Sequence, residues 1–274
     1  MNRPTEIYAK SGLIVGLVTI IFLPTLRWLI QSWLGNPYYS HGFLVPIITM
    51  FLISRRLQVK TEPWNAGVLF ILIGLAGHLA SIPFRMHILS AAGLIVVIFG
   101  LVLTFVGRQA TRQWAFALTF LVLAIPLPFV ERLSPPLEAF VAKYATLCVQ
   151  PLGVAATTLG SQVQLASAAF TVGAPCSGLR SIVALLTLTV LFVHMVNGPL
   201  WGKVTLLFAA LPIAVTANLV RVSSLFLVAD TLGAETGLRY YHALSSPTLF
   251  LIALSMLFAT SRGVRCSVIR SDFW

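Results

Sequence analysis

Long apolar runs separated by short polar segments dominate the chain. About eight of these runs approach the ~20 residues that a helix needs to cross the hydrocarbon core of a bilayer. The second run is shorter than the others, and all are bounded by polar or basic residues. The pattern predicts an all-α polytopic membrane protein of about eight transmembrane helices. The runs lie at residues 12–33, 40–54, 66–84, 88–107, 113–130, 177–197, 203–229 and 244–260.

Composition agrees with a membrane protein, because 58% of the residues are hydrophobic and only 9% are charged. A soluble domain carries roughly 25% charged residues. The net charge of +11 comes from basic residues that flank the apolar runs rather than from a nucleic-acid-binding patch. By the positive-inside rule these clusters place both termini in the cytoplasm of an inner-membrane protein. The clusters comprise Arg3, Lys10, Arg55, Arg56, Lys60, Arg108, Arg112, Lys203, Arg262, Arg265 and Arg270.

The same topology assigns four segments to the external face, at 36–41, 83–87, 131–176 and 230–242. The longest of them, between the fifth and sixth spans, begins with helical spacing of apolar residues over 135–160, which predicts an amphipathic or interfacial helix. Polar and apolar residues then alternate over 162–165 and 169–172, which predicts a small periplasmic β-hairpin. We therefore expect one integral-membrane domain over 1–274.

Cys176 follows Pro175, which cannot continue a helix backward, so a helix is expected to begin at or just after the cysteine. The positive end of that helix and the cation of Arg180, one turn on, would both favour the thiolate. A cysteine in a membrane protein is otherwise a small buried hydrophobic residue, and this interpretation fits Cys148 and Cys266.

Arg221 lies inside the seventh apolar run, where a charged side chain costs at least about 2.5 kcal/mol and normally faces a polar cavity. Asn218 is one helical turn away and could share that cavity. The alternative is that the arginine extends along the helix to the membrane surface.

His242 begins the eighth run and could exchange a proton near neutral pH. Alone, it could equally be an interfacial residue beside Tyr240 and Tyr241. Thiol, guanidinium and imidazole nevertheless come from three spans that end at one face. A thiol with a base is the minimum for covalent catalysis, and an arginine can stabilise the oxyanion. His41 also faces outward and could line the same site or cap a short span. The sequence contains no metal-binding or phosphate-binding motif.

Four segments resemble the exosortases, with the archaeosortases as relatives. They cover most of the chain, from about 36 to 260. The Cys-Ser-Gly-Leu-Arg motif is the most specific of them, and the Tyr-Ser-His-Gly motif supports it. The segments are Tyr39 to Pro46; Ile125 to Phe129 with Pro135 to Leu137; Pro175 to Ser181; and Ala217 to Val222, followed by His242.

The resemblance implies a membrane-embedded cysteine transpeptidase that acts without a cofactor at the periplasmic face. Its substrates would be exported proteins with a C-terminal sorting signal, consisting of a short motif such as Pro-Glu-Pro, a transmembrane helix and a basic tail. The acceptor would be a membrane lipid or a lipid-linked or polysaccharide-associated amine, within an exopolysaccharide or biofilm system. Cys176 would be the nucleophile, Arg221 the stabilising cation and His242 the acid and base. Supporting or substrate-binding positions would be Ser177, Arg180, Asn218 and His41.

Two other functions are compatible with parts of the pattern. A transporter or flippase could use Arg221 as a substrate anchor, but it would carry polar residues through the full membrane depth. Here the polar residues gather at one face. An intramembrane hydrolase would share the catalytic residues and differ only in using water as the acceptor.

Overall fold

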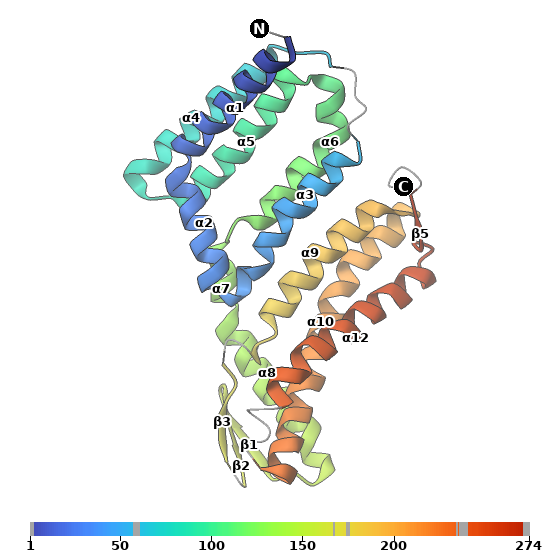
Figure 1. Ribbon diagram of the computed structural model, residues 1–274. Helices are drawn as coiled ribbons and strands as arrows, with labels where there is room; N and C mark the ends of the chain where they lie inside the picture. Colours follow the sequence, from blue (N-terminus) through green and yellow to red (C-terminus); the bar gives the residue numbers. More distant parts are fainter. Residues whose placement is uncertain are drawn as a thin grey trace. The chain divides into compact units, whose positions relative to one another are not determined.

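The computed structural model divides the chain into two compact units, Met1–Leu127 and Pro128–Trp274 (Figure 1). The single domain expected from the sequence stays a prediction. The structure describes residues 3–56, 61–166, 168–173, 176–233, 235 and 241–270, and describes residues 3–11, 242–244 and 246 among them by their backbone alone.

The elements that the structure describes in the first unit are α-helices and 3₁₀ helices. The run at 12–33, which the sequence predicted as one span, forms parts of two helices, and their axes differ by 71° across the break at Phe22. The elements are α1 (Arg3–Ile21), α2 (Leu23–Gly35), the 3₁₀ helix η1 (Pro37–Phe43), α3 (Leu44–Ser54), α4 (Ala66–Phe84), α5 (His87–Phe105), α6 (Arg108–Phe120) and the 3₁₀ helix η2 (Leu121–Ala124).

Helices α4 and α5 run side by side as a hairpin (Figure 1). Glycines face each other across the pair, and a Cβ on Gly74 would lie 2.6 Å from the carbonyl oxygen of Gly93. Gly67 and Gly100 meet in the same way one heptad along. Small residues at this spacing let two helix backbones approach closely, which is how apolar helices associate in lipid.

The segment around η1 stabilises the irregular end of η2. Pro126 and Pro128 have no N–H, so they cannot donate to the carbonyls one turn earlier. Side chains from α2 and η1 donate to exposed carbonyls here instead. The donors are Trp33 Nε1 to Ala124 O at 2.8 Å, Tyr39 Oη to Leu127 O at 2.7 Å and His41 Nε2 to Leu123 O at 3.3 Å. The early Tyr-Ser-His-Gly and Ile-Pro-Leu-Pro motifs therefore form one structural contact.

The second unit contains a helical part and a small sheet. Its elements are α7 (Pro128–Arg132), α8 (Ser134–Val149), the 3₁₀ helix η3 (Gln150–Leu152), β1 (Ala156–Leu159), β2 (Gln162–Leu165), β3 (Ala169–Thr171), α9 (Leu179–Met195), β4 (Val196–Asn197), α10 (Leu200–Leu232), α12 (His242–Gly263) and β5 (Val268–Ile269).

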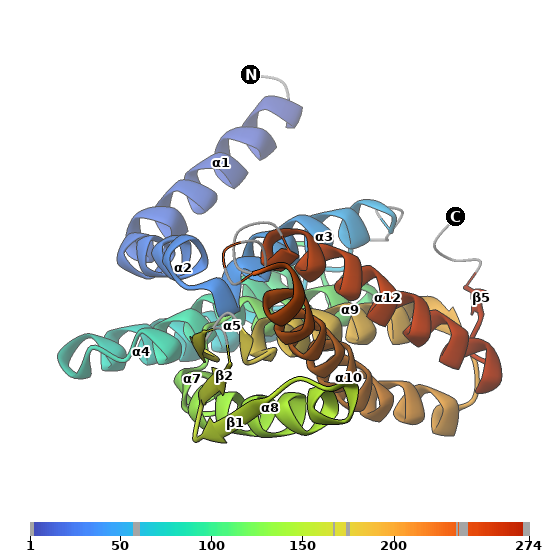
Figure 2. The same ribbon diagram turned by 90° about the horizontal axis from the view of Figure 1, so that it is seen from below.

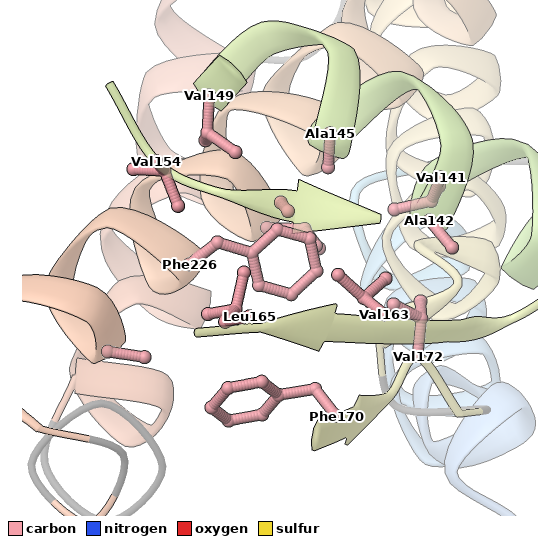
Figure 3. Close-up of a cluster of buried hydrophobic side chains, with 13 residues drawn as sticks. Val141, Ala142, Ala145, Val149, Val154, Val163, Leu165, Phe170, Val172 and Phe226 are labelled. Atoms are coloured by element: carbon pink, nitrogen blue, oxygen red, sulfur yellow. The ribbon is translucent and has the colours of Figure 1, made fainter. Parts of the chain in front are cut away.

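The three strands β1, β2 and β3 form an antiparallel sheet in sequence order, in which Val163 lies opposite Phe170. Alternate side chains of this sheet face α8 and the second half of α10 (Figure 3). Phe226 of α10 is 1% exposed and lies at the centre of the cluster. Cys176 packs against the edge of the same cluster. The sheet, α8 and the second half of α10 thus enclose one apolar cluster, against which Cys176 packs, and Figure 2 shows the backbone of these elements.

The sequence predicted the two strands that became β2 and β3, but it was wrong about the helix over 135–160. The helix ends at Val149, and residues 156–159 form β1 instead. Gly153 has φ +90°, a conformation that favours glycine and ends the helical path. Thr157 and Thr158 then pair with β2, where β-branched residues pack well.

Helix length limits how many membrane crossings the structure supports. Among the described residues, α4, α5 and α10 are each long and apolar enough to cross a membrane, and the number rises to five if each of two bent helix pairs is one span. Helix α9 has 17 residues and α3 only 11, which is short for a bilayer. The structure therefore supports a mostly helical, multi-pass protein, and the count of eight spans stays a prediction.

Candidate active site

Cys176 lies in a short loop between the sheet and α9. Its backbone N–H donates to Gly173 O at 2.8 Å, and Ser177 N donates to the same oxygen at 3.1 Å. Ser177 is 1% exposed, and its Oγ accepts from Leu179 N at 3.3 Å, which gives the first N–H of α9 a partner. Helix α9 begins at Leu179, so the cysteine precedes the helix rather than starting it.

Gly178 and Asn218 hold this loop against α10. Gly178 has φ +80°, and a Cβ there would lie 2.6 Å from Cγ and Nδ2 of Asn218. Both the backbone conformation and the close approach therefore require glycine. Asn218 in turn donates from Nδ2 to Cys176 O at 2.9 Å. The Cys-Ser-Gly segment and the α10 segment that carries Asn218 are thus joined directly.

Arg221 lies on α10 one turn after Asn218, and the two side chains are 7% and 5% exposed. Both line a small pocket between α9, α10 and α12, whose cavity volume of about 10 Å³ is roughly that needed for one water molecule. The remaining lining is largely apolar and comprises Ser181, Leu185, Ala214, Ala217, Leu249, Phe250 and Ala253. Arg221 therefore faces the protein interior rather than the membrane surface, but the pocket beside it is largely apolar, whereas the sequence predicted a polar cavity.

Burial raises the pKa of the Cys176 thiol above its ordinary value, the positive charge of Arg221 opposes this, and the negative charge of Glu138 adds to it. The sequence had predicted that Arg180 and the helix end would favour the thiolate. Arg180 is exposed on α9, and Arg221 is the cation that acts on the sulfur. A thiol with a raised pKa is mostly protonated near pH 7, so catalysis by Cys176 requires a base.

Replacing Glu138 by glutamine tests this electrostatic account. The carboxylate disfavours the thiolate, so its removal should lower the pKa of Cys176. Alkylation by iodoacetamide should then rise at lower pH in Glu138→Gln than in the native chain, because only the thiolate reacts. Rates at Cys176 and at the exposed Cys148 can be read separately by peptide mass spectrometry. An unchanged pH profile at Cys176 would show that Glu138 does not act on the thiol.

The start of α12 is tied to α10 close to Arg221. Tyr241 Oη lies 2.6 Å from Ser224 Oγ, and Ser224 Oγ donates to Arg221 O at 3.0 Å and Val220 O at 2.7 Å. Helix α12 begins at His242, the next residue, whose side chain lies outside the described residues. The role of His242 therefore stays a prediction, while the backbone beside it is anchored to the turn that carries Arg221.

His41 belongs to the first unit, where its ring contacts Leu123 O. Because a carbonyl only accepts, Nε2 carries the proton in this contact. Burial lowers the pKa of His41, which favours the neutral ring. The contact supports the structural role of His41, and its place in the candidate site stays a prediction.

The other two cysteines differ in burial. Cys148 is exposed, whereas Cys266 is fully buried against Gly198 and Gly202.

Sequence reasoning missed Glu138, Gly178 and Tyr241. Glu138 is one of only seven acidic residues in the chain and accepts from Ser134 Oγ at 2.7 Å. The sequence could have indicated a role for Glu138, because an acidic residue stands here in the first turns of a helix that begins with a Pro-Pro pair. Among the described residues, no group of three or more His, Cys, Asp or Glu is placed to hold a metal ion.

Comparison with known proteins gives one match. The family model described as transmembrane exosortase (Exosortase_EpsH) matches residues 33–259, a range that includes Cys176, Asn218, Arg221 and His242. No curated protein and no solved structure matches the chain. The family resemblance found in the sequence is therefore confirmed.

Proposed function

The chain belongs to the transmembrane exosortase family. From this premise we propose that it cleaves exported proteins at their C-terminal sorting signals and transfers the cleaved proteins to an acceptor. Family membership supports a membrane cysteine transpeptidase in general. The observation that carries the proposal is the direct joining of the Cys176 loop to the helix of Asn218 and Arg221. That joining supports a site in which the thiol of Cys176 acts together with the buried guanidinium of Arg221.

In the proposed reaction, His242 removes the proton from the Cys176 thiol. The sulfur then attacks the carbonyl carbon of the scissile peptide bond, and Arg221 stabilises the oxyanion that forms. As the C–N bond breaks, the leaving amine takes the proton from His242 and a thioester remains. The nucleophile of the acceptor attacks the thioester, forms the new bond and releases the thiol.

The buried position of Arg221 supports this role. An arginine in a dry pocket acts more strongly on a developing negative charge than one in water.

The proposed substrate is a peptide that ends in a short motif of the Pro-Glu-Pro type, an apolar helix and a basic tail. The proposed arrangement has about eight spans, both termini in the cytoplasm and the site at the periplasmic face of the inner membrane. The acceptor is a lipid or a lipid-linked or polysaccharide-associated amine, within an exopolysaccharide system.

The test is to co-express the full chain with a secreted reporter that ends in such a signal and to incubate the membranes with hydroxylamine. A thioester reacts with hydroxylamine, so the processed reporter should end in a hydroxamate that mass spectrometry detects. The product made without hydroxylamine identifies the natural acceptor.

Two results would contradict the proposal. An uncleaved reporter would argue against sorting-signal cleavage. A cleaved reporter that carries only a free carboxylate, even in excess hydroxylamine, would argue against a thioester and for direct hydrolysis. A reporter without the basic tail serves as the matched control and should remain uncleaved.

A further inference from the structure

Asn218 carries one polar atom that its own contacts leave unused. Its side chain is 5% exposed and lines the pocket beside Arg221. Nδ2 donates to Cys176 O, while Oδ1 is buried and has no hydrogen-bond partner among the described residues. A buried acceptor without a donor costs free energy, so such an atom usually marks a place where another group binds.

The orientation of this amide is determined by its neighbours. The carbonyl of Cys176 can only accept a hydrogen bond, so the atom facing it must be the NH₂ group and not the oxygen. Gly178 packs against Cβ, Cγ and Nδ2 of Asn218 and leaves little room for the side chain to turn. Oδ1 is therefore kept as the available acceptor.

The chemistry of the pocket restricts what could bind. Oδ1 requires a donor, which excludes a phosphate or carboxylate as its partner. The guanidinium of Arg221, one turn away, carries donors alone. A peptide unit presents a donor N–H and an acceptor C=O within one short segment. Six of the other lining residues are apolar, and their side chains offer a ligand no further hydrogen bond: Leu185, Ala214, Ala217, Leu249, Phe250 and Ala253.

We propose that Asn218 binds the backbone of the substrate peptide, with Oδ1 accepting an N–H next to the scissile bond. The inference rests on the proposed function, because it takes a peptide to be the substrate. It gives Asn218 two simultaneous tasks, since Nδ2 positions the nucleophile loop and Oδ1 contacts the substrate. Recognition of backbone rather than side chain would make this contact independent of the peptide sequence.

Two small electrophiles test the contact without a natural substrate. Iodoacetamide carries an N–H, whereas methyl iodoacetate has an ester oxygen in its place. Both alkylate the full chain in native membranes, and the exposed Cys148 reports their intrinsic rates within the same molecule. We expect the amide-to-ester rate ratio at Cys176 to exceed that at Cys148 by about fivefold to tenfold, the effect of one hydrogen bond.

Two variants of similar size separate substrate contact from loop positioning. Asn218→Asp and Asn218→Leu both lose the donor to Cys176 O, but only the aspartate keeps an acceptor. The amide preference should persist in Asn218→Asp and disappear in Asn218→Leu. Because each value is a ratio at one thiol, changes in the thiolate fraction cancel.

Two outcomes would overturn the inference. One is a wild-type ratio at Cys176 equal to that at Cys148. The other is equal loss of the preference in both variants, which would leave Asn218 with the loop-positioning task alone. Neither outcome bears on thioester formation, which the hydroxylamine experiment tests separately, so failure of this inference and failure of the proposed function can be told apart.

Discussion

Cys176→Ala should reduce processing of a sorting-signal reporter to background, a loss of at least about a thousandfold. Without the sulfur no thioester can form, and the arginine and the base have no nucleophile to assist. The change removes little volume at the edge of the core, so the fold should persist. The measurement is the rate at which the reporter loses its C-terminal tail in membranes.

Cys148→Ala is the matched control, because it removes an exposed thiol from α8 of the same unit. It should process the reporter at the native rate. Continued protection of the buried Cys266 from alkylation in the Cys176→Ala chain would report that the unit remains folded. Native processing by Cys176→Ala would exclude this residue as the nucleophile.

Arg221→Gln should slow processing by about a hundredfold to a thousandfold, the usual cost of removing an oxyanion-stabilising group. Two effects act in the same direction. The oxyanion loses its partner, and loss of the positive charge raises the pKa of Cys176 further. Alkylation of Cys176 near pH 7 should therefore also become slower. Arg221→Lys keeps the charge without the planar fork and should recover only part of both losses.

Arg132→Gln, at an exposed arginine of α7, controls for the general loss of a positive charge and should leave both measurements unchanged. Slow processing with native alkylation in Arg221→Gln would assign the arginine to the oxyanion alone. Native rates in both assays would remove Arg221 from the site.

Much of this molecule could be predicted from apolar periodicity and from the cost of burying charge. A guanidinium within an apolar run had to face the protein interior rather than lipid, and Arg221 is buried and lines a pocket. Strand alternation likewise predicted strands over 162–165 and 169–172, and residues 162–164 pair with 169–171 in the structure. Both features depend on residues that are neighbours along the chain and on whether a side chain faces lipid or the protein interior. The order of residues in the sequence is enough to predict them.

Contacts between distant segments could not be predicted in this way. Arg180 is the nearest cation to Cys176 along the chain, yet Arg221, 45 residues on, is the one that acts on the thiol. The role of Gly178 depends on Asn218, and that of Glu138 on how α8 packs against α10. Span length was also misleading, because the 71° bend at Phe22 divides an apolar run that reads as continuous.

The contact between Gly178 and Asn218 also has a consequence for how the protein is made. The cysteine loop leaves the ribosome before α10, and its anchoring partner lies 42 residues later than Cys176. During synthesis the loop therefore emerges without the hydrogen bond that orders it and without the cation that acts on its sulfur. Completion of α10 supplies both at once. The order of the chain thus delays assembly of the reactive centre until the helix beside it has been inserted.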